Sequence, residues 1–221
     1  MITRISRHEI EKITSTPVED ITEHDRDEMA IPTYTHSNPL IRWLMWKRYD
    51  RLADMLEGNT SGAALEFGCG IGLFLPELSK QYGKVYAMDL FPQYAKRMAR
   101  EKNINVNFIA ILDEVNDESL DVIIAADVLE HIENLDNTLE LFASKLKKRG
   151  QFLVSGPTES SFYKFGRLIA GFGGKGDYHH TNIYNLFDAI EKAGFIKGET
   201  VNLPFAFAPP LFKLCAFTKA G

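Results

Sequence analysis

Three glycines and one aspartate are spaced as a nucleotide-binding turn requires. Gly68, Gly70 and Gly72 form G-x-G-x-G directly after an apolar segment, and residues without Cβ let the backbone adopt positive φ and approach a ligand closely. Asp89 lies 19 positions after Gly70 (89 minus 70), where a carboxylate can accept hydrogen bonds from vicinal ribose hydroxyls. Taken alone, the glycines could make a tight turn and Asp89 could cap a helix. Together they favour a ligand that contains a ribose.

The same turn departs from two other nucleotide motifs. The dinucleotide fingerprint G-x-G-x-x-G needs glycine at position 73, which is Leu73 here. A P-loop is excluded because no Gly-Lys-Ser/Thr follows the turn. NAD is disfavoured further by the absence of an evident Tyr-x-x-x-Lys pair for hydride transfer.

Composition excludes several classes of function. The chain has 221 residues with a formal net charge of -5, so it has no global basic field for a nucleic acid or an anionic bilayer. Cys69 and Cys215 have no neighbours at metal-ligand spacing, so we expect no metal site. The N-terminal residues are charged, and no apolar run approaches about 18 residues, so we expect a cytoplasmic protein without a signal peptide or a transmembrane segment.

Strand and helix patterns alternate from residue 63 onward, which predicts an α/β, mostly parallel sheet with helices on both faces. Residues 1–37 read as an N-terminal extension with a short helix at 5–13, and 38–221 as one domain with an insertion at 157–180. The domain opens with an amphipathic helix from Pro39 towards Gly58. The predicted strands are 63–67, 84–88, 106–110, 120–125, 151–155, 196–203 and 211–218, and the predicted helices are 73–82, 92–102, 135–146 and 182–193. Lys147 to Gly150 are expected to close the helix at 135–146.

Residues 63–155 resemble the core of the class I S-adenosylmethionine-dependent methyltransferases. The family's acidic residue-x-G-x-G-x-G motif is matched by Glu66, Gly68, Gly70 and Gly72, and its acidic end of strand two by Asp89. LDVIIAADVLEHI at 120–132 is similar to the family's fourth motif, with leucine in place of the usual first phenylalanine. QFLVSGP at 151–157 resembles its fifth strand. The resemblance implies a doubly wound, seven-stranded Rossmann-like sheet that binds S-adenosylmethionine and releases S-adenosylhomocysteine.

The resemblance also implies the role of each residue near the turn. Glu66 would lie near the methionine end of the cofactor, and Asp89 on the ribose hydroxyls, with Leu90 against adenine. The loop backbone would approach the ribose and methionine. The cofactor-binding residues predicted in this loop are Phe67, Gly68, Cys69, Gly70 and Gly72.

Two further pairs of residues complete the predicted cofactor site. Asp127 and Val128, after the fourth strand, would border the sulfonium. The third motif departs from the family, which often has an aspartate after strand three where this chain reads IAILDEV. Either Ile111 and Leu112 only sandwich the adenine ring, or Asp113 takes the polar role through a shifted register.

Methyl transfer from a sulfonium depends on in-line positioning, so no catalytic residue is obligatory. A hydroxyl acceptor would need a general base, and His131, His179 and His180 are the candidates near the predicted site. The alternative for His131 is that it lies at the start of a helix and only packs against its neighbours.

The acceptor is expected to be a small molecule, with an apolar body if the aromatic insertion contacts it. Residues 161–174 could form a lid, a lipid-contacting face or a packed amphipathic helix. Phe205, Phe207 and Phe212 could be a pocket wall, a homodimer contact or core. Two alternatives to a methyltransferase stay open: a protein that binds the cofactor without turnover, and an NAD-dependent oxidoreductase.

Overall fold

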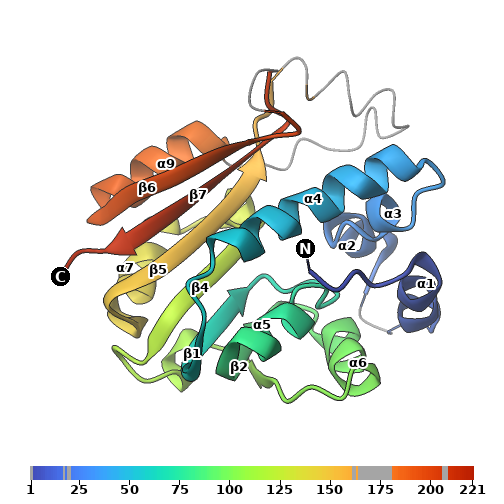
Figure 1. The fold of residues 1–221 in the computed structure, drawn as a ribbon, viewed down its shortest axis with the longest axis horizontal. Coiled ribbons are helices and arrows are strands. Elements are labelled where there is room, and N and C mark those ends of the chain that lie inside the picture. Colours follow the sequence, from blue (N-terminus) through green and yellow to red (C-terminus); the bar gives the residue numbers. More distant parts are fainter. Residues whose placement is uncertain (1, 17, 19–20, 161–162, 164–180, 206–208) are drawn as a thin grey trace. The chain divides into compact units, whose positions relative to one another are not determined.

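The computed structural model describes residues 2–16, 18, 21–160, 163, 181–205 and 209–221 (Figure 1). The chain divides into two compact units, Met1–Glu114 and Val115–Gly221. Each unit is described by itself below. The predicted division into an extension of 37 residues and one domain stays a prediction.

The first unit contains three parallel strands in the order β3-β2-β1. These are β1 (Asn59–Phe67), β2 (Tyr82–Met88) and β3 (Asn107–Ile109), joined by helices α5 (Leu75–Gln81) and α6 (Gln93–Glu101). Phe67 pairs with Met88, and Met88 pairs with Ile109. Because the strands are parallel and end in register, the turns that follow all three begin at the same edge of the sheet.

Among the residues described before the first strand there are four helices: α1 (Arg7–Ser15), α2 (Glu23–Glu28), α3 (Ile31–Tyr34) and α4 (Pro39–Met55). The sequence predicts the first and the last of these, but not α2 and α3. A capping box between Ser6 and Glu9 starts α1. Glu9 also pairs with Lys102 at 2.6 Å, and this hydrogen bond is the main cause that lowers the pKa of Glu9 to about 2. Helix α1 of the N-terminal segment (residues 1–37) is therefore bound to the C-terminal end of α6.

The second unit contains four strands in the order β4-β5-β7-β6. These are β4 (Leu120–Ala126), β5 (Leu146–Pro157), β6 (Phe195–Leu203) and β7 (Phe212–Lys219), with helices α7 (Leu135–Lys145) and α9 (Ile183–Lys192) and the 3-10 turn η2 (Leu129–His131). Strands β4 and β5 are parallel, whereas β7 runs antiparallel to β5 and β6. The inner residues of β4 and β5 are buried, as their nearly unbroken apolar runs predict.

The predicted helix end at Lys147 to Gly150 is wrong, and the first strand begins at Asn59 rather than at residue 63. The sequence places Lys147 to Gly150 at the end of a helix, but α7 ends at Lys145 and β5 begins at Leu146. Lys147 instead pairs with Asp121 of β4 at 2.8 Å, and Arg149 adopts a φ of 62°. A left-handed residue before a glycine is typical of a helix end, but here it lies within β5, where the pairing with β4 shifts register between Leu146 and Gln151.

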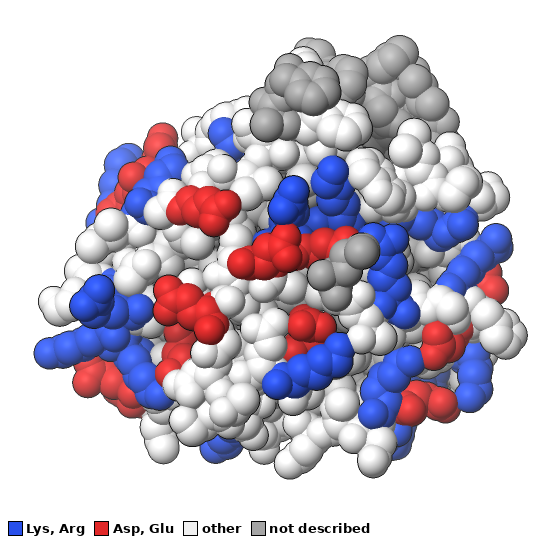
Figure 2. Space-filling model, in the orientation of Figure 1, with Lys and Arg blue, Asp and Glu red and all other residues white. Residues whose placement is uncertain are grey.

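Acidic and basic side chains are interspersed on the face shown in Figure 2, without a broad region of one sign among the described residues. Some of the opposite charges form ion pairs, and in the first unit these include Arg4 with Asp50 and Lys12 with Glu101. No helix among the described residues has the length and apolar character needed to cross a membrane.

Candidate functional site

The glycine turn leaves β1 in a conformation that favours glycine. Gly68, Gly70 and Gly72 have φ values of 73°, 51° and 78°, in the left-handed region that costs other residues about 1 to 2 kcal/mol each. The N–H groups of Gly68 and Cys69 donate to the Met88 carbonyl at 2.8 and 3.1 Å. The turn is thereby fixed to the end of β2.

Asp89 follows β2 directly and binds this turn through its side chain. Oδ2 accepts a hydrogen bond from the Gly70 N–H at 2.7 Å, and Oδ1 accepts one from the Phe91 N–H at 2.9 Å. Helix α6 begins at Gln93 with Pro92 at its N-cap, so Asp89 does not cap that helix. A carboxylate has about four acceptor positions, and these two bonds leave each oxygen able to accept from a ligand hydroxyl.

Gly70 and Gly72 have different surroundings although both have positive φ. A Cβ added at Gly70 would meet no atom within 4 Å. A Cβ at Gly72 would lie 2.9 Å from Leu75 Cδ1 and 3.1 Å from Cα and Cβ of Ala95 on α6. The backbone at Gly70 therefore faces open space, whereas Gly72 allows the turn to pack against a helix.

Glu66, the penultimate residue of β1, is a buried carboxyl group with only 1% of its surface exposed. Burial, followed by the negative charge of Asp89, raises the pKa of Glu66 well above its usual range. Its Oε2 atom has no hydrogen-bond partner among the described residues. A buried group of this kind favours a cationic ligand that would stabilise its ionised form.

A buried arginine and two tyrosines lie in the same unit, and the sequence analysis did not assign them to the site. Arg48 of α4 is 2% exposed, and its Nη2 donates to the Tyr34 hydroxyl at 3.0 Å. Its guanidinium lies 5.4 Å from the centre of the Tyr49 ring. One signal was available, because Arg48 occupies an apolar position in the stripe that predicted α4, and a fully buried arginine needs a partner.

Tyr34 and Tyr49 lie within the electrostatic influence of both Arg48 and Glu66. Burial is the largest cause that raises the pKa of both hydroxyls, and the charges of Arg48 and Glu66 each act on both. Arg48 and Glu66 therefore both act on the same pair of buried tyrosines.

The residues predicted to contact adenine differ in exposure. Leu90 is 89% exposed and Ile111 is 57% exposed, whereas Leu112 is buried. Leu112 and the exposed Asp113 lie in the 3-10 turn η1 (Leu112–Glu114). Glu114 shapes this turn, since its Oε1 accepts from the N–H groups of Ala110 and Ile111 at 2.7 and 3.2 Å. Ile111 therefore offers apolar surface that Leu112 does not.

Phe67 and Cys69 are both buried beside the turn. Burial is the main cause that raises the pKa of the Cys69 thiol well above its usual range, which keeps it neutral and unreactive. Among the described residues, no group of three or more His, Cys, Asp or Glu could hold a metal ion.

The remaining predicted residues belong to the second unit. Asp127 follows β4 with a φ of 55°, and its Oδ1 accepts from the Ser155 hydroxyl at 2.9 Å. Val128 precedes η2, and His131 ends it in a half-buried position. His179, His180 and most of the predicted lid at 161–174 lie outside the described residues.

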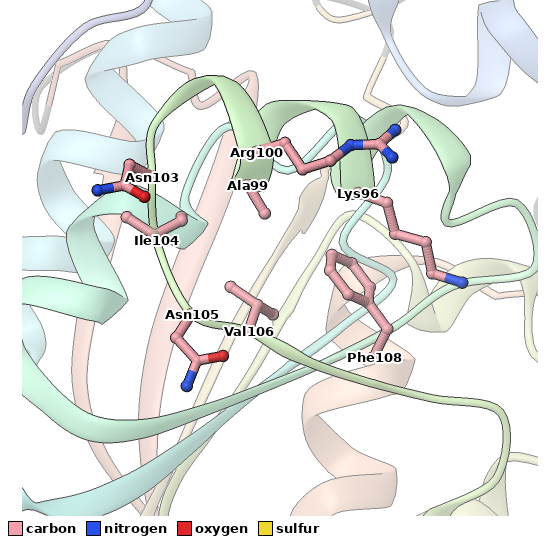
Figure 3. Close-up of a pocket in the computed structure, with 8 residues that line it drawn as sticks. All are labelled: Lys96, Ala99, Arg100, Asn103, Ile104, Asn105, Val106 and Phe108. Atoms are coloured by element: carbon pink, nitrogen blue, oxygen red, sulfur yellow. The ribbon is translucent and has the colours of Figure 1, made fainter.

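A hollow of about 490 Å³ lies between the end of α6 and β3 and includes none of the predicted site residues. Figure 3 shows Lys96 and Arg100 extending from α6 above Phe108. The Lys96 amine already lies 5.6 Å from the centre of the Phe108 ring. Because no buried polar group points into this hollow, we assign no ligand to it.

The family model described as a methyltransferase domain matches residues 41–195. A ubiquinone biosynthesis O-methyltransferase of Rickettsia bellii is 33% identical over 96 residues, which are 41% of this chain and 40% of that protein. The match with these curated relatives thus spans about two fifths of their length.

Solved structures share the fold. The N-methyltransferase NodS of Bradyrhizobium japonicum, in complex with S-adenosyl-L-homocysteine, has a TM-score of 0.66 at 17% identity and covers 89% of this chain and 97% of its own. The cyclase SpnF has a TM-score of 0.63 at 14% identity and covers 79% of this chain and 80% of its own. This likeness confirms the predicted fold class, a seven-stranded, mostly parallel sheet with helices on both faces.

Alanine at Gly70 and at Gly72 is expected to affect stability unequally. Both variants place a Cβ on a residue with positive φ, but only Gly72→Ala also drives it into Leu75 and Ala95. We expect Gly72→Ala to lower the free energy of unfolding by about 1 to 3 kcal/mol more than Gly70→Ala, which is the usual cost of overpacking. Urea unfolding of both variants measures the difference, and equal losses would contradict the proposed packing at Gly72.

Proposed function

The chain belongs to the methyltransferase-domain family, and we propose that it transfers a methyl group from S-adenosylmethionine to a small acceptor with an apolar body. The Asp89 carboxylate carries this proposal, because it lies at the end of β2 with its Oδ2 atom 2.7 Å from the Gly70 nitrogen. A carboxylate held against a glycine turn can accept both hydroxyls of a ribose. The open space at Gly70 supports the approach of a ligand to the turn.

The surroundings of the turn suit the adenine ring. Leu90 and Ile111 are large apolar side chains that are mostly exposed, and they follow β2 and β3 at the same edge of the sheet. Covering them with a planar ring would remove apolar surface from water. We assign the adenine contact to these two residues, with the buried Leu112 packing behind them.

Glu66 and Arg48, two buried ionisable side chains, suit the amino-acid end of the cofactor, which carries an ammonium and a carboxylate. Glu66 has a buried oxygen without a partner among the described residues, and it would accept from the ammonium. Arg48 presents a guanidinium, whose fork of donors matches a carboxylate. A zwitterionic ligand would place its ammonium beside Glu66 and its carboxylate beside Arg48.

S-adenosylmethionine would supply a methyl carbon already activated by its sulfonium. The chain then has to position the acceptor in line with that carbon and exclude water. Asp127 and Val128 follow β4, and we assign them to the border of the reacting carbon. The bond between Asp127 and Ser155 would hold the Asp127 carboxylate in place. His131 and the histidines at 179 and 180 remain the proposed bases for an acceptor that must lose a proton.

Aromatic residues at the carboxyl end of β5 support an apolar acceptor. Tyr163 packs edge-on against Phe212, with ring centres 5.8 Å apart, and Phe205 is half exposed. Open α/β sheets bind ligands at this edge. The name of the curated relatives, ubiquinone biosynthesis O-methyltransferase, supports an acceptor of this kind.

Asp89→Ala is expected to weaken binding of S-adenosylhomocysteine by about 1.5 to 3 kcal/mol, the scale of hydrogen bonds to a charged group. Isothermal titration calorimetry measures the affinity, and circular dichroism tests whether the fold is retained. Glu199→Ala removes an exposed carboxylate of β6 and is the matched control that should bind normally. An affinity unchanged by Asp89→Ala would refute the ribose assignment.

Binding of S-adenosylhomocysteine is also expected to release a proton from Glu66. Burial and Asp89 raise the pKa of Glu66 in the free protein, and an ammonium beside the carboxyl would lower that pKa. The affinity should therefore rise with pH through the window between the bound and the free pKa values. Calorimetric titrations in buffers of different ionisation enthalpy count the protons released.

Glu66→Gln is the matched variant for this measurement, because it keeps the size of the side chain and cannot titrate. It should release fewer protons than the unmodified protein at the same pH. Equal release by the two proteins, or none by the unmodified protein, would contradict the contact between Glu66 and the ammonium.

A further inference from the structure

A tyrosine from the N-terminal segment contacts the arginine that we assign to the cofactor's carboxylate. Tyr34 is the last residue of α3 and is 2% exposed. Its hydroxyl accepts the hydrogen bond from Arg48 Nη2. The hydroxyl is the only polar atom of the Tyr34 side chain, and it is the atom that binds Arg48.

Stacked rings hold this tyrosine in place. The Tyr34 ring is stacked on that of Tyr49, with centres 5.9 Å apart and planes inclined by 12°. The Tyr49 ring is stacked in turn on Phe74, at 5.2 Å and 12°. Phe74 is the N-cap of α5, two residues beyond Gly72. The stack therefore links α3 and α4 to the helix that follows the glycine turn.

The segment that carries Tyr34 is itself built into the first unit. Arg26 of α2 donates through Nη1 to the Thr14 carbonyl at 3.0 Å and to the Tyr94 hydroxyl at 2.7 Å. Arg97 of α6 donates to the carbonyls of Ile13 and Thr16. These bonds join the C-terminal end of α1 and helix α2 to α6.

We propose that Tyr34 is a positioning residue that orients the Arg48 guanidinium to bind the carboxylate of the cofactor's methionine moiety. A guanidinium is a planar fork of donors, so a hydrogen bond at one nitrogen fixes the plane in which the others point. The face of Tyr49, 5.4 Å from the guanidinium carbon, limits the remaining rotation. This inference rests on the proposed function, since the carboxylate is that of the proposed cofactor.

The N-terminal segment would then contribute to selectivity for the amino-acid end of the ligand. Tyr34 would leave the contacts with ribose and adenine unchanged, because Asp89, Leu90 and Ile111 provide those. The affinity for a ligand without the amino-acid end should therefore not depend on Tyr34.

Tyr34→Phe in the full chain tests this, because phenylalanine keeps the stacked ring and removes only the hydroxyl. Two probes are titrated by calorimetry: S-adenosylhomocysteine, and methylthioadenosine, which has the adenine and ribose but no amino-acid end. We expect the variant to raise the Kd for S-adenosylhomocysteine about tenfold, the scale of one hydrogen bond to a charged group. The Kd for methylthioadenosine should change by less than about twofold.

Tyr94→Phe is the matched control. Tyr94 is a fully buried tyrosine of α6 whose hydroxyl accepts a hydrogen bond from Arg26. The variant therefore removes the same kind of tyrosine–arginine hydrogen bond elsewhere in the same unit. It should leave the ratio of the two Kd values unchanged. If Tyr34→Phe weakens both probes equally, or neither, or if Tyr94→Phe shifts the ratio as much, the positioning role is overturned while the proposed function stands. If the unmodified protein binds neither probe, the proposed function fails instead.

Discussion

The hydrogen bond from the Gly70 N–H to the Asp89 carboxylate joins the ends of two parallel strands, and the proposed site is arranged around it. Positive φ at Gly70 turns its N–H towards Asp89. The pairing of Phe67 with Met88 brings the two turns to the same edge of the sheet. A carboxylate already bound to the backbone has little orientational freedom left to lose, so a ribose that meets it binds a preorganised acceptor. The same arrangement explains why Gly72 must stay small, since the turn packs there against α6.

Two buried ionisable side chains impose the second constraint. Burying a charge costs free energy unless a partner compensates it, and burial accordingly raises the pKa of Glu66, which lies in the same unit as the buried Arg48. Aromatic rings contribute to this environment: Tyr34, Tyr49 and Phe74 form a stack beside Arg48. The ammonium of the proposed ligand would favour the ionised form of Glu66, and its carboxylate would accept from Arg48.

Local sequence patterns predicted the residues of the turn but not those that come from distant helices. The glycine spacing, the acidic end of β2 and the apolar run of β4 depend on near neighbours, and the structure contains the strands that they predict. Tyr34 could not be found this way, because its contact with Arg48 depends on how α3 packs against α4. Glu114 was missed for a similar reason, since its role is to accept from backbone N–H groups that no pattern reveals. The cytoplasmic location, the homodimer contact and the absence of a nucleic-acid partner stay predictions from the sequence.

Titration of the unmodified chain with S-adenosylhomocysteine and, separately, with NAD tests the central claim most directly. Both ligands contain an adenosine moiety, but only the first has the zwitterionic end that would meet Glu66 and Arg48, and Leu73 removes the third glycine of the dinucleotide motif. We expect S-adenosylhomocysteine to bind with one site per chain and a micromolar Kd, and NAD to give no measurable heat. Micromolar binding of NAD without binding of S-adenosylhomocysteine would contradict the account.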